Sequence, residues 1–401
     1  MHSPHRRFTT VLAVAAAAAL AVTACSSGLD DDSGDAGDGS ASDGASGAAS
    51  VFGQCPDGEP VESIDLAAAQ AVIDEYMAPA EGIVIDEPLA EPIDPDLTVA
   101  FIDNDTTVAG LMWQHIAEAA DTAGVDITRV SAGNSAQSIN TTFSTLVEDP
   151  PDIVIAPAID PTLWSDQLDA LRAADTTIVT GAITNAEDFG LDDTYGGYGA
   201  SVENGRVLAA AALTMTCGTA TEFAFYNVPE LPFSNVQQES AVAALDEFCD
   251  GACTLRTIDI PVAQMTTGGP DAVLSDLQAH PETAAFITPI DEIQVGLPAK
   301  QDLAGIDVPG LGQSSTPPNI EQIEAGDQAG GFAVDLRQFV WLLLDQGLRL
   351  DQGMDYPEPD WAAINPQIST ILTEDTAAES SDGYIAVPDF EDQFAALWGV
   401  E

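Results

Sequence analysis

The chain has 401 residues and a formal net charge of −57, from 66 acidic and 9 basic residues. This excess of carboxylates excludes nucleic acid and anionic lipid as electrostatic partners. The part that follows residue 50 is too long for one small core and predicts two lobes of ordinary domain size.

Residues 1–24 are predicted to be a lipoprotein signal peptide. Two arginines precede the apolar run 11–20, which is shorter than the roughly 20 residues of a permanent membrane helix. Small residues then lead to Cys25 and resemble the lipobox of bacterial lipoproteins, which implies cleavage before Cys25 and a diacylglycerol on its sulfur. Because two acyl chains anchor firmly, we expect an extracytoplasmic protein on the outer face of the cell membrane. Secretion with a free Cys25 thiol is the alternative.

Residues 25–50 form a predicted flexible, acidic tether. They are almost wholly Ser, Gly, Ala and Asp, a composition that buries too little apolar surface to order itself. Residues 51–96 follow as an N-terminal extension before the first clear strand.

Four further cysteines lie in this exported part of the chain, where disulfides persist. Cys249 and Cys253 flank a short turn that can bring their Cα atoms within bridging distance, so we predict that they pair. By elimination Cys55 pairs with Cys217 and fastens the N-terminal segment to the body. Zinc binding is the alternative, but neither histidine of the mature chain lies near these cysteines.

From residue 97 short β-rich runs alternate with amphipathic stretches, the pattern of a parallel sheet covered by helices. Strands are predicted at 97–102, 125–131, 152–156 and 176–180, and a helix follows each. In the first helix apolar residues recur every three or four positions from Val108 to Ala120, which places one face on the sheet. Gly124 ends that helix.

A second series of the same kind begins after a helix predicted at 204–216. Its strands are predicted at 222–227, 254–260, 284–288 and 307–311, and its helices at 235–248, 271–279 and 292–303. Two such series in tandem predict an α/β protein with two doubly wound, Rossmann-like lobes and a cleft between them. In these sheets ligands bind beyond the carboxyl ends of the strands.

In element order the chain from residue 97 to residue 401 resembles a type I periplasmic binding protein of the ribose-binding kind. The segments that carry this resemblance are 99–104, 153–157, 286–292 leading to Gly296, 306–316 and 390–399. It implies the receptor of an ABC importer, with three crossings between the lobes near Val202, near Asp335 and near the C-terminal segment. It also implies that residues 97–202 with 335–372 form one lobe and residues 203–334 with 373–401 the other.

The chain departs from this family at three positions. Ser314 stands where sugar binders often carry Asp, Ile290 stands where Asn commonly precedes the Asp-Glu pair, and the arginine usual near Asn235 is missing. These departures argue against a simple pentose or hexose as the ligand.

Residues that follow the predicted strands are the candidate ligand contacts: Asn104, Asp105, Asp160, Asn185, Phe233, Asn235, Asp291, Glu292, Gln313, Ser314 and Asp335. Amides and hydroxyls both donate and accept, and carboxylates accept hydroxyl hydrogens, which suits a sugar or polyol derivative. For Asp105, Asp160 and Asp291 helix capping is the alternative role. Among the arginines of the mature chain only Arg337 falls near a cleft loop, so a neutral ligand is favoured over an anion.

An organic cation is the alternative ligand, held by carboxylates and by aromatic rings such as Trp113, Trp164, Tyr195 and Tyr198. Of the aromatic residues, Phe233 and Trp164 are placed to face a ligand. No nucleophile elbow, P-loop or zinc-helix motif is present, so we expect no enzyme, cofactor or metal. A carboxylate-dependent glycan hydrolase and a structural surface protein without a ligand cleft remain as alternatives. The expected partners are a small solute and an ABC permease, and the expected state is a monomer.

Overall fold

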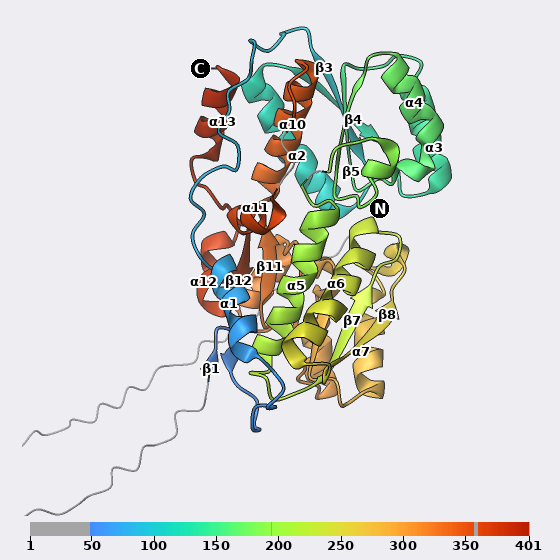
Figure 1. Ribbon diagram of the computed structural model, residues 1–401. Helices are drawn as coiled ribbons and strands as arrows, with labels where there is room; N and C mark the ends of the chain where they lie inside the picture. Colours follow the sequence, from blue (N-terminus) through green and yellow to red (C-terminus); the bar gives the residue numbers. More distant parts are fainter. Residues whose placement is uncertain (1–48, 194, 357–359, 401) are drawn as a thin grey trace, which may run out of the picture. The chain divides into compact units, whose positions relative to one another are not determined.

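The computed structural model describes residues 49–193, 195–356 and 360–400. The signal peptide, Cys25 and nearly all of the tether therefore lie outside the described residues. The described part contains two four-stranded parallel sheets, each covered by helices (Figure 1). This is the two-lobed, doubly wound α/β class that the sequence predicts. Within these ranges no helix is long and apolar enough to cross a bilayer.

The first sheet has the strand order β4-β3-β5-β6. Its strands are β3 (Thr98–Asp103), β4 (Asp126–Ser131), β5 (Ile153–Pro157) and β6 (Thr177–Gly181). Its helices are α2 (Thr107–Ala123), α3 (Ala136–Leu146), α4 (Ser165–Ala173) and α10 (Leu336–Asp351), with short turns η1 (Pro161–Leu163) and η2 (Glu187–Phe189). Side chains alternate along β3, so Val99 and Phe101 pack with α2 and α10 while Ala100 and Ile102 pack with α3 and α4.

The second sheet repeats this topology with the order β10-β9-β7-β8. Its strands are β7 (Glu222–Asn227), β8 (Thr254–Asp259), β9 (Ala285–Thr288) and β10 (Gly310–Gly312). Its helices are α5 (Tyr198–Met215), α6 (Pro232–Cys249), α7 (Gly269–Ala279) and α8 (Leu297–Ala304), with η3 (Val262–Gln264) and η4 (Asp291–Gln294). The helix predicted at 292–303 is interrupted, because Gly296 has the left-handed φ of 78° that ends η4 and begins α8.

The C-terminal segment passes three times between the lobes. It contains β11 (Gly331–Val334), α10, α11 (Trp361–Ile368), β12 (Ser369–Leu372), α12 (Glu374–Ala377), η5 (Ala378–Ser380) and α13 (Phe390–Trp398). The passages run from β11 to α10, from α10 to β12 and from β12 to α13. The strands β11 and β12 pair antiparallel, and the bridge from Gln313 to Phe332 joins them to the second sheet. Helix α13 returns to the first lobe, where the Trp398 ring stacks on Trp341 of α10 with ring centroids 5.3 Å apart.

The structure thus divides this segment differently from the expectation. Residues 369–372 belong with the second lobe because β12 pairs with β11, and residues 390–398 belong with the first lobe because α13 packs on α2 and α10. The periodicity of a helix identifies its apolar face but not the lobe that this face covers.

The N-terminal extension adds a further passage between the lobes. The hairpin strands β1 (Ala49–Ser50) and β2 (Gly53–Gln54) and helix α1 (Leu66–Tyr76) come first, and α1 packs on α5. The chain then runs to β3 along the first lobe, where Glu87 accepts a hydrogen bond from Arg349 and Leu89 donates one to Leu397. The lobes are therefore connected at more places than the three crossings that the resemblance implied.

Both predicted disulfides are confirmed. Cys249 and Cys253 are joined across the end of α6, and Cys55 is joined to Cys217 at the end of α5; the Cα atoms are 5.6 Å apart in each pair. The second bond fastens the N-terminal extension to the second lobe across a sequence separation of 162 residues.

The two disulfides are expected to differ in their contribution to stability. Loop-closure entropy assigns about 5 kcal/mol to a bridge that spans 162 residues and about 2 kcal/mol to one that spans 4. Urea unfolding of the Cys55→Ser/Cys217→Ser protein should therefore show the larger loss of unfolding free energy, and the Cys249→Ser/Cys253→Ser protein is the matched control. Equal losses would contradict the entropic account.

Candidate ligand-binding site

The main candidate site is a cavity between the two sheets, at the carboxyl ends of their strands. In the first lobe the segments after β3, β5 and β6 contribute Asn104, Ala158 and Ala182. In the second lobe the segments after β7, β9 and β10 contribute Leu231, Ile290 and Gln313. The cavity thus lies where ligands bind in open parallel sheets.

The backbone is unusual at these strand ends. Asp105, Ala158, Ala182 and Ser314 adopt left-handed conformations with φ of 59°, 54°, 51° and 59°. A residue with a Cβ rarely occupies this region, and such conformations cluster at functional sites. Three of the four, Ala158, Ala182 and Ser314, line the cavity. The strained turns therefore mark the same region as the cavity does.

The cavity lining is uncharged. None of the described residues that line it is Asp, Glu, Lys, Arg or His, although the chain carries a net charge of −57. The polar members are Asn104, Thr106, Asn204, Gln237, Gln313, Ser314, Asn365 and Ser369. Such a site offers hydrogen bonds but no ion pair, which suits a neutral ligand.

Among the polar side chains of this lining, Gln237 has the clearest unused hydrogen-bonding capacity. Its side chain is fully buried on α6, and its Nε2 donates a hydrogen bond to Oε1 of Gln313. Its own Oε1 has no partner. Because a buried acceptor without a partner is costly, this oxygen is a place for a ligand hydroxyl to donate.

Asn365 and Asn204 line the cavity and are hydrogen-bonded to each other. Asn365 Nδ2 donates to Asn204 Oδ1 at 2.6 Å and to the Tyr76 hydroxyl at 3.2 Å. These contacts join α11, α5 and α1. Asn365 and Asn204 are thus held to each other and to α1, an element of the second-lobe side.

A second groove opens outward from the cavity. It shares Asn104 and Leu231 with the cavity and adds Asp160, Asn185 and Asn235. Each of the three added polar residues already has an internal partner, since Asp160 accepts from Thr162 and Asn185, and Asn235 bonds to Asn227 and Pro229.

The two lobes touch at this groove. The Thr184 hydroxyl, in the segment after β6, donates to the carbonyl oxygen of Pro232 at the start of α6 at 3.4 Å. The structure therefore has the lobes in contact across the opening of the cleft.

Two of the predicted carboxylates lie inside the protein instead of facing the cavity. Asp291 is fully buried and accepts hydrogen bonds from Gln294, Ser315 and Gln328. Asp335 is also buried, caps α10 by accepting from the Gln338 amide, and accepts from the Ala386 amide. Their expected role as ligand contacts is corrected, because these carboxylates hold loops and helix ends together.

Three other expected contacts also lie outside the cavity lining. Asp105 is exposed and accepts from the Ser131 hydroxyl. Glu292 is buried within η4. Trp164 was expected to face the ligand but is fully buried in the first lobe, stacked on Phe143 at 3.9 Å. The expected contacts that do line the cavity are Asn104, Phe233, Gln313 and Ser314.

Several lining residues were not predicted from the sequence. Val108 and Met112 were assigned to the core face of their helix, and their position near its start also brings them to the cavity. Gln237 follows Phe233 by four residues on α6, and this spacing places both on one helix face. That spacing was the signal that could have identified Gln237.

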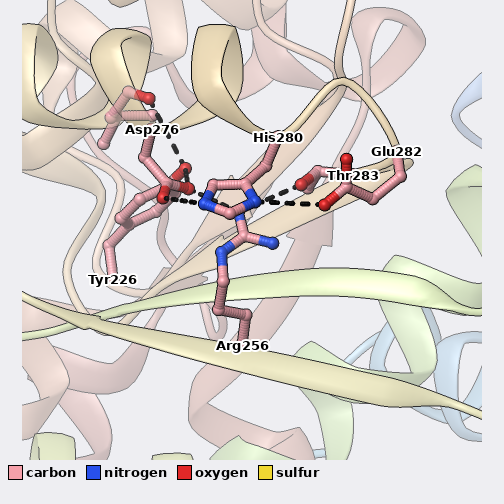
Figure 2. Close-up of polar contacts among 7 residues, drawn as sticks. Tyr226, Arg256, Asp276, His280, Glu282 and Thr283 are labelled. Atoms are coloured by element: carbon pink, nitrogen blue, oxygen red, sulfur yellow. Dashed lines mark hydrogen bonds and ion pairs between the residues drawn. The ribbon is translucent and has the colours of Figure 1, made fainter.

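A polar cluster in the second lobe lies away from this site. Figure 2 shows Asp276 of α7 accepting from the Tyr226 hydroxyl at 2.9 Å and pairing with Arg256 at 2.5 Å. His280 lies 3.7 Å from Asp276 and 3.0 Å from Glu282. None of these residues lines the cavity, and together they fasten α7 to β7 and β8. Among the described residues no group of His, Cys, Asp or Glu could hold a metal ion.

Comparison with family models and with curated protein sequences finds no match. Comparison with solved structures finds many chains with this architecture. A 5-methylthioribose transporter solute-binding protein from Thermotoga lettingae TMO, in complex with 5-methylthioribose, has a TM-score of 0.63 at 12% identity. The match covers 78% of this chain and 99% of that one.

Two further structures match over a similar extent. An ABC transporter solute-binding protein from Agrobacterium vitis with bound allitol has a TM-score of 0.61 at 14% identity, over 71% of this chain and 98% of that one. A periplasmic ABC transporter solute-binding protein from Actinobacillus succinogenes 130z with bound D-allose has a TM-score of 0.59 at 16% identity. That match covers 71% of this chain and 100% of the other. The chain therefore has the fold of the periplasmic sugar-binding proteins of ABC transporters, as its resemblance to the ribose-binding kind predicted.

The buried carboxylates give the fold a pH dependence. Burial raises the pKa of Asp291 to about 7 and that of Asp335 to about 6, and hydrogen bonds to each carboxylate oppose the rise. The pKa values of both carboxyl groups are higher in the folded state than in the unfolded state. Their contribution to the unfolding free energy is therefore complete below about pH 4 and is lost as the pH rises through 6 to 7.

We therefore expect the unfolding free energy to fall between pH 5 and pH 8 by an amount on the order of a few kcal/mol. In the Asp291→Asn protein this fall should be smaller, because one of the two groups no longer titrates. Denaturant unfolding at both pH values measures it, and Asp302→Asn, at an exposed carboxylate of α8, is the control. An Asp291→Asn protein with the full wild-type fall would refute this assignment.

Proposed function

We propose that this protein is an extracytoplasmic solute-binding lipoprotein that captures a sugar or polyol derivative and presents it to an ABC permease. The observation that carries the proposal is an uncharged cavity between two doubly wound lobes, lined from the carboxyl ends of the strands of both. The protein itself performs no chemistry in this function.

The structural neighbours support this ligand class. Those from Thermotoga lettingae, Agrobacterium vitis and Actinobacillus succinogenes hold 5-methylthioribose, allitol and D-allose. These are neutral compounds rich in hydroxyl groups. The amide and hydroxyl groups of the cavity lining have the donors and acceptors that such compounds need.

Capture proceeds by closure of the lobes about their connections. A ligand that contacts both lobes binds the closed state better than the open one and shifts the population toward it. Phe233 and Gln237 from the second lobe and Asn104 from the first supply such contacts. The closed form then docks on the permease.

The alternative functions receive less support from the site. A buried organic cation needs a carboxylate partner, and a carboxylate-dependent hydrolase needs two carboxyl groups at the scissile bond. The described lining of the cavity includes neither. Asp160 and Glu230 line only the outer groove.

A library of sugars, polyols and organic cations tests the proposal by thermal unfolding. A true ligand at about 100 times its Kd should stabilise the protein by about 2.7 kcal/mol and raise the Tm by several degrees. Gln237→Leu should weaken that ligand roughly fivefold to tenfold, because it removes one hydrogen bond from a buried site.

Gln346→Leu is the matched control for this substitution. Gln346 is an equally buried glutamine on α10 with an unpartnered Oε1, and it does not line the cavity. Its replacement should leave the ligand affinity unchanged. If no sugar or polyol raises the Tm, or if only cations do, the proposed ligand class is wrong.

The location of the protein is part of the proposal. We expect the Cys25→Ser protein to be released from the membrane fraction into the extracytoplasmic fluid, because it lacks the acylated sulfur that anchors the chain. Immunoblotting of membrane and soluble fractions measures this, with Ser26→Ala as the control that keeps the cysteine. Retention of Cys25→Ser on the membrane would contradict lipid anchoring at this position.

A further inference from the structure

Much of the cavity lining is apolar, and this narrows the chemical class of the ligand. Ten of its 21 described residues are Val, Leu, Ile, Met or Phe, and none is charged. We infer that the ligand is a neutral sugar or polyol in which an apolar group, such as a methyl or alkylthio group, replaces at least one hydroxyl. This inference rests on the proposed function and narrows its ligand class.

Both lobes contribute to the apolar lining. Val108 and Met112 of α2 approach the cavity from the first lobe, and Leu231, Met265 and Ile290 approach it from the second. All five are less than 10% exposed and belong to one hydrophobic cluster that continues into both lobes. A ligand enclosed here therefore meets apolar side chains on two sides.

The cavity correspondingly has few polar groups that are free to form hydrogen bonds with a ligand. Several polar groups in the lining are already bonded to one another, since Asn104 accepts from Thr106, Gln313 accepts from Gln237, and Asn365 donates to Asn204. Among the described lining residues there is no carboxylate or guanidinium that could bond two hydroxyls at once. A hydroxyl buried against Met265 or Ile290 would lose its hydrogen bonds to water without replacement, which is costly.

One part of the ligand must nevertheless carry hydroxyl groups. The unpartnered Oε1 of Gln237 requires a donor, and Gln313 and Ser314 lie in the same lining. The amides of the cavity thus call for hydroxyl groups on the ligand, and its aliphatic side chains call for an apolar group. A sugar with one apolar arm meets both requirements.

Binding of matched compounds to the purified full-length protein tests the inference. The pairs are D-ribose with 5-methylthio-D-ribose, and D-galactose with its 6-deoxy analogue, and calorimetry gives the Kd of each. In the methylthio compound one sulfur and one carbon replace a hydroxyl oxygen, and burial of these two atoms should make it bind about tenfold or more tightly than ribose. The 6-deoxy sugar should bind more tightly than galactose by roughly fourfold.

Substitutions in the lining identify the origin of this preference. Met112→Gln and Met265→Gln place an amide in the apolar lining and should reduce the ratio of the two affinities toward one. Gln237→Leu should weaken both members of a pair by a similar factor and leave their ratio unchanged. Gln346→Leu, outside the cavity, should change neither the affinities nor the ratio.

The outcomes separate this inference from the proposed function. If the unmodified sugars bind as tightly as their analogues or more tightly, the protein remains a sugar receptor and the inference is wrong. If neither these compounds nor any sugar or polyol of the library binds, the proposed function fails and the inference fails with it. A preference for the substituted compounds that the methionine variants abolish supports both.

Discussion

Every strand of the two central sheets runs parallel to its neighbours, and the rest of the molecule follows from that constraint. A parallel sheet needs helices on both faces, so neither face is free to bind a solute. Its carboxyl-terminal edge is where successive loops meet. In this chain the two edges supply the same cavity, and the residues that line it come from segments far apart in the sequence.

Buried carboxylates hold the connections between the lobes. Asp335 stands where the chain leaves β11 for α10, and it also binds the Ala386 amide on the later passage toward α13. Asp345 accepts from Arg349 and from the indole of Trp398, which fastens α13 to α10. Burial raises the pKa of Asp345, and the neighbouring Arg349 guanidinium opposes the rise. Asp335 thus holds two passages between the lobes together, and Asp345 fixes the helix in which the last passage ends.

The sequence predicted the repeating elements well, because a buried parallel strand is a short apolar run and each covering helix has one apolar face. It could not predict where the final helix packs, since α13 contacts α2 and α10 through residues about 50 to 280 positions away. The site was predicted in part for a related reason. A polar residue after a strand can point into the cleft, as Gln313 does, or back into its own lobe, as Asp291 does.

Whether such a side chain points back into its own lobe depends on hydrogen-bond partners that local sequence patterns do not reveal. Asp291 turns inward because Gln294, Ser315 and Gln328 surround it with donors, and Ser315 and Gln328 lie 24 and 37 residues further along the chain. Asn365 and Ile368 reach the cavity from α11, which has neither the strand nor the loop pattern used to find candidates. The aliphatic contacts, unlike Phe233, were missed because an aliphatic side chain in a helix looks the same in sequence whether it meets the core or a ligand.

In the proposed function the acidic chain and its uncharged cavity would disfavour ions of both signs by different means. An anion approaching the protein is repelled by the field of a chain with a net charge of −57. A cation is attracted to the surface, but within the cavity it would lose its water and find no carboxylate among the described lining residues. In the proposed receptor, discrimination among neutral solutes would then fall to Gln237 and the apolar lining. A buried amide rejects a ligand without the matching hydroxyl more strongly than an apolar pocket rejects one lacking a methyl group. Under the proposed function Gln237 would therefore decide whether a compound is accepted as a polyol, and the aliphatic side chains would rank the polyols that are accepted.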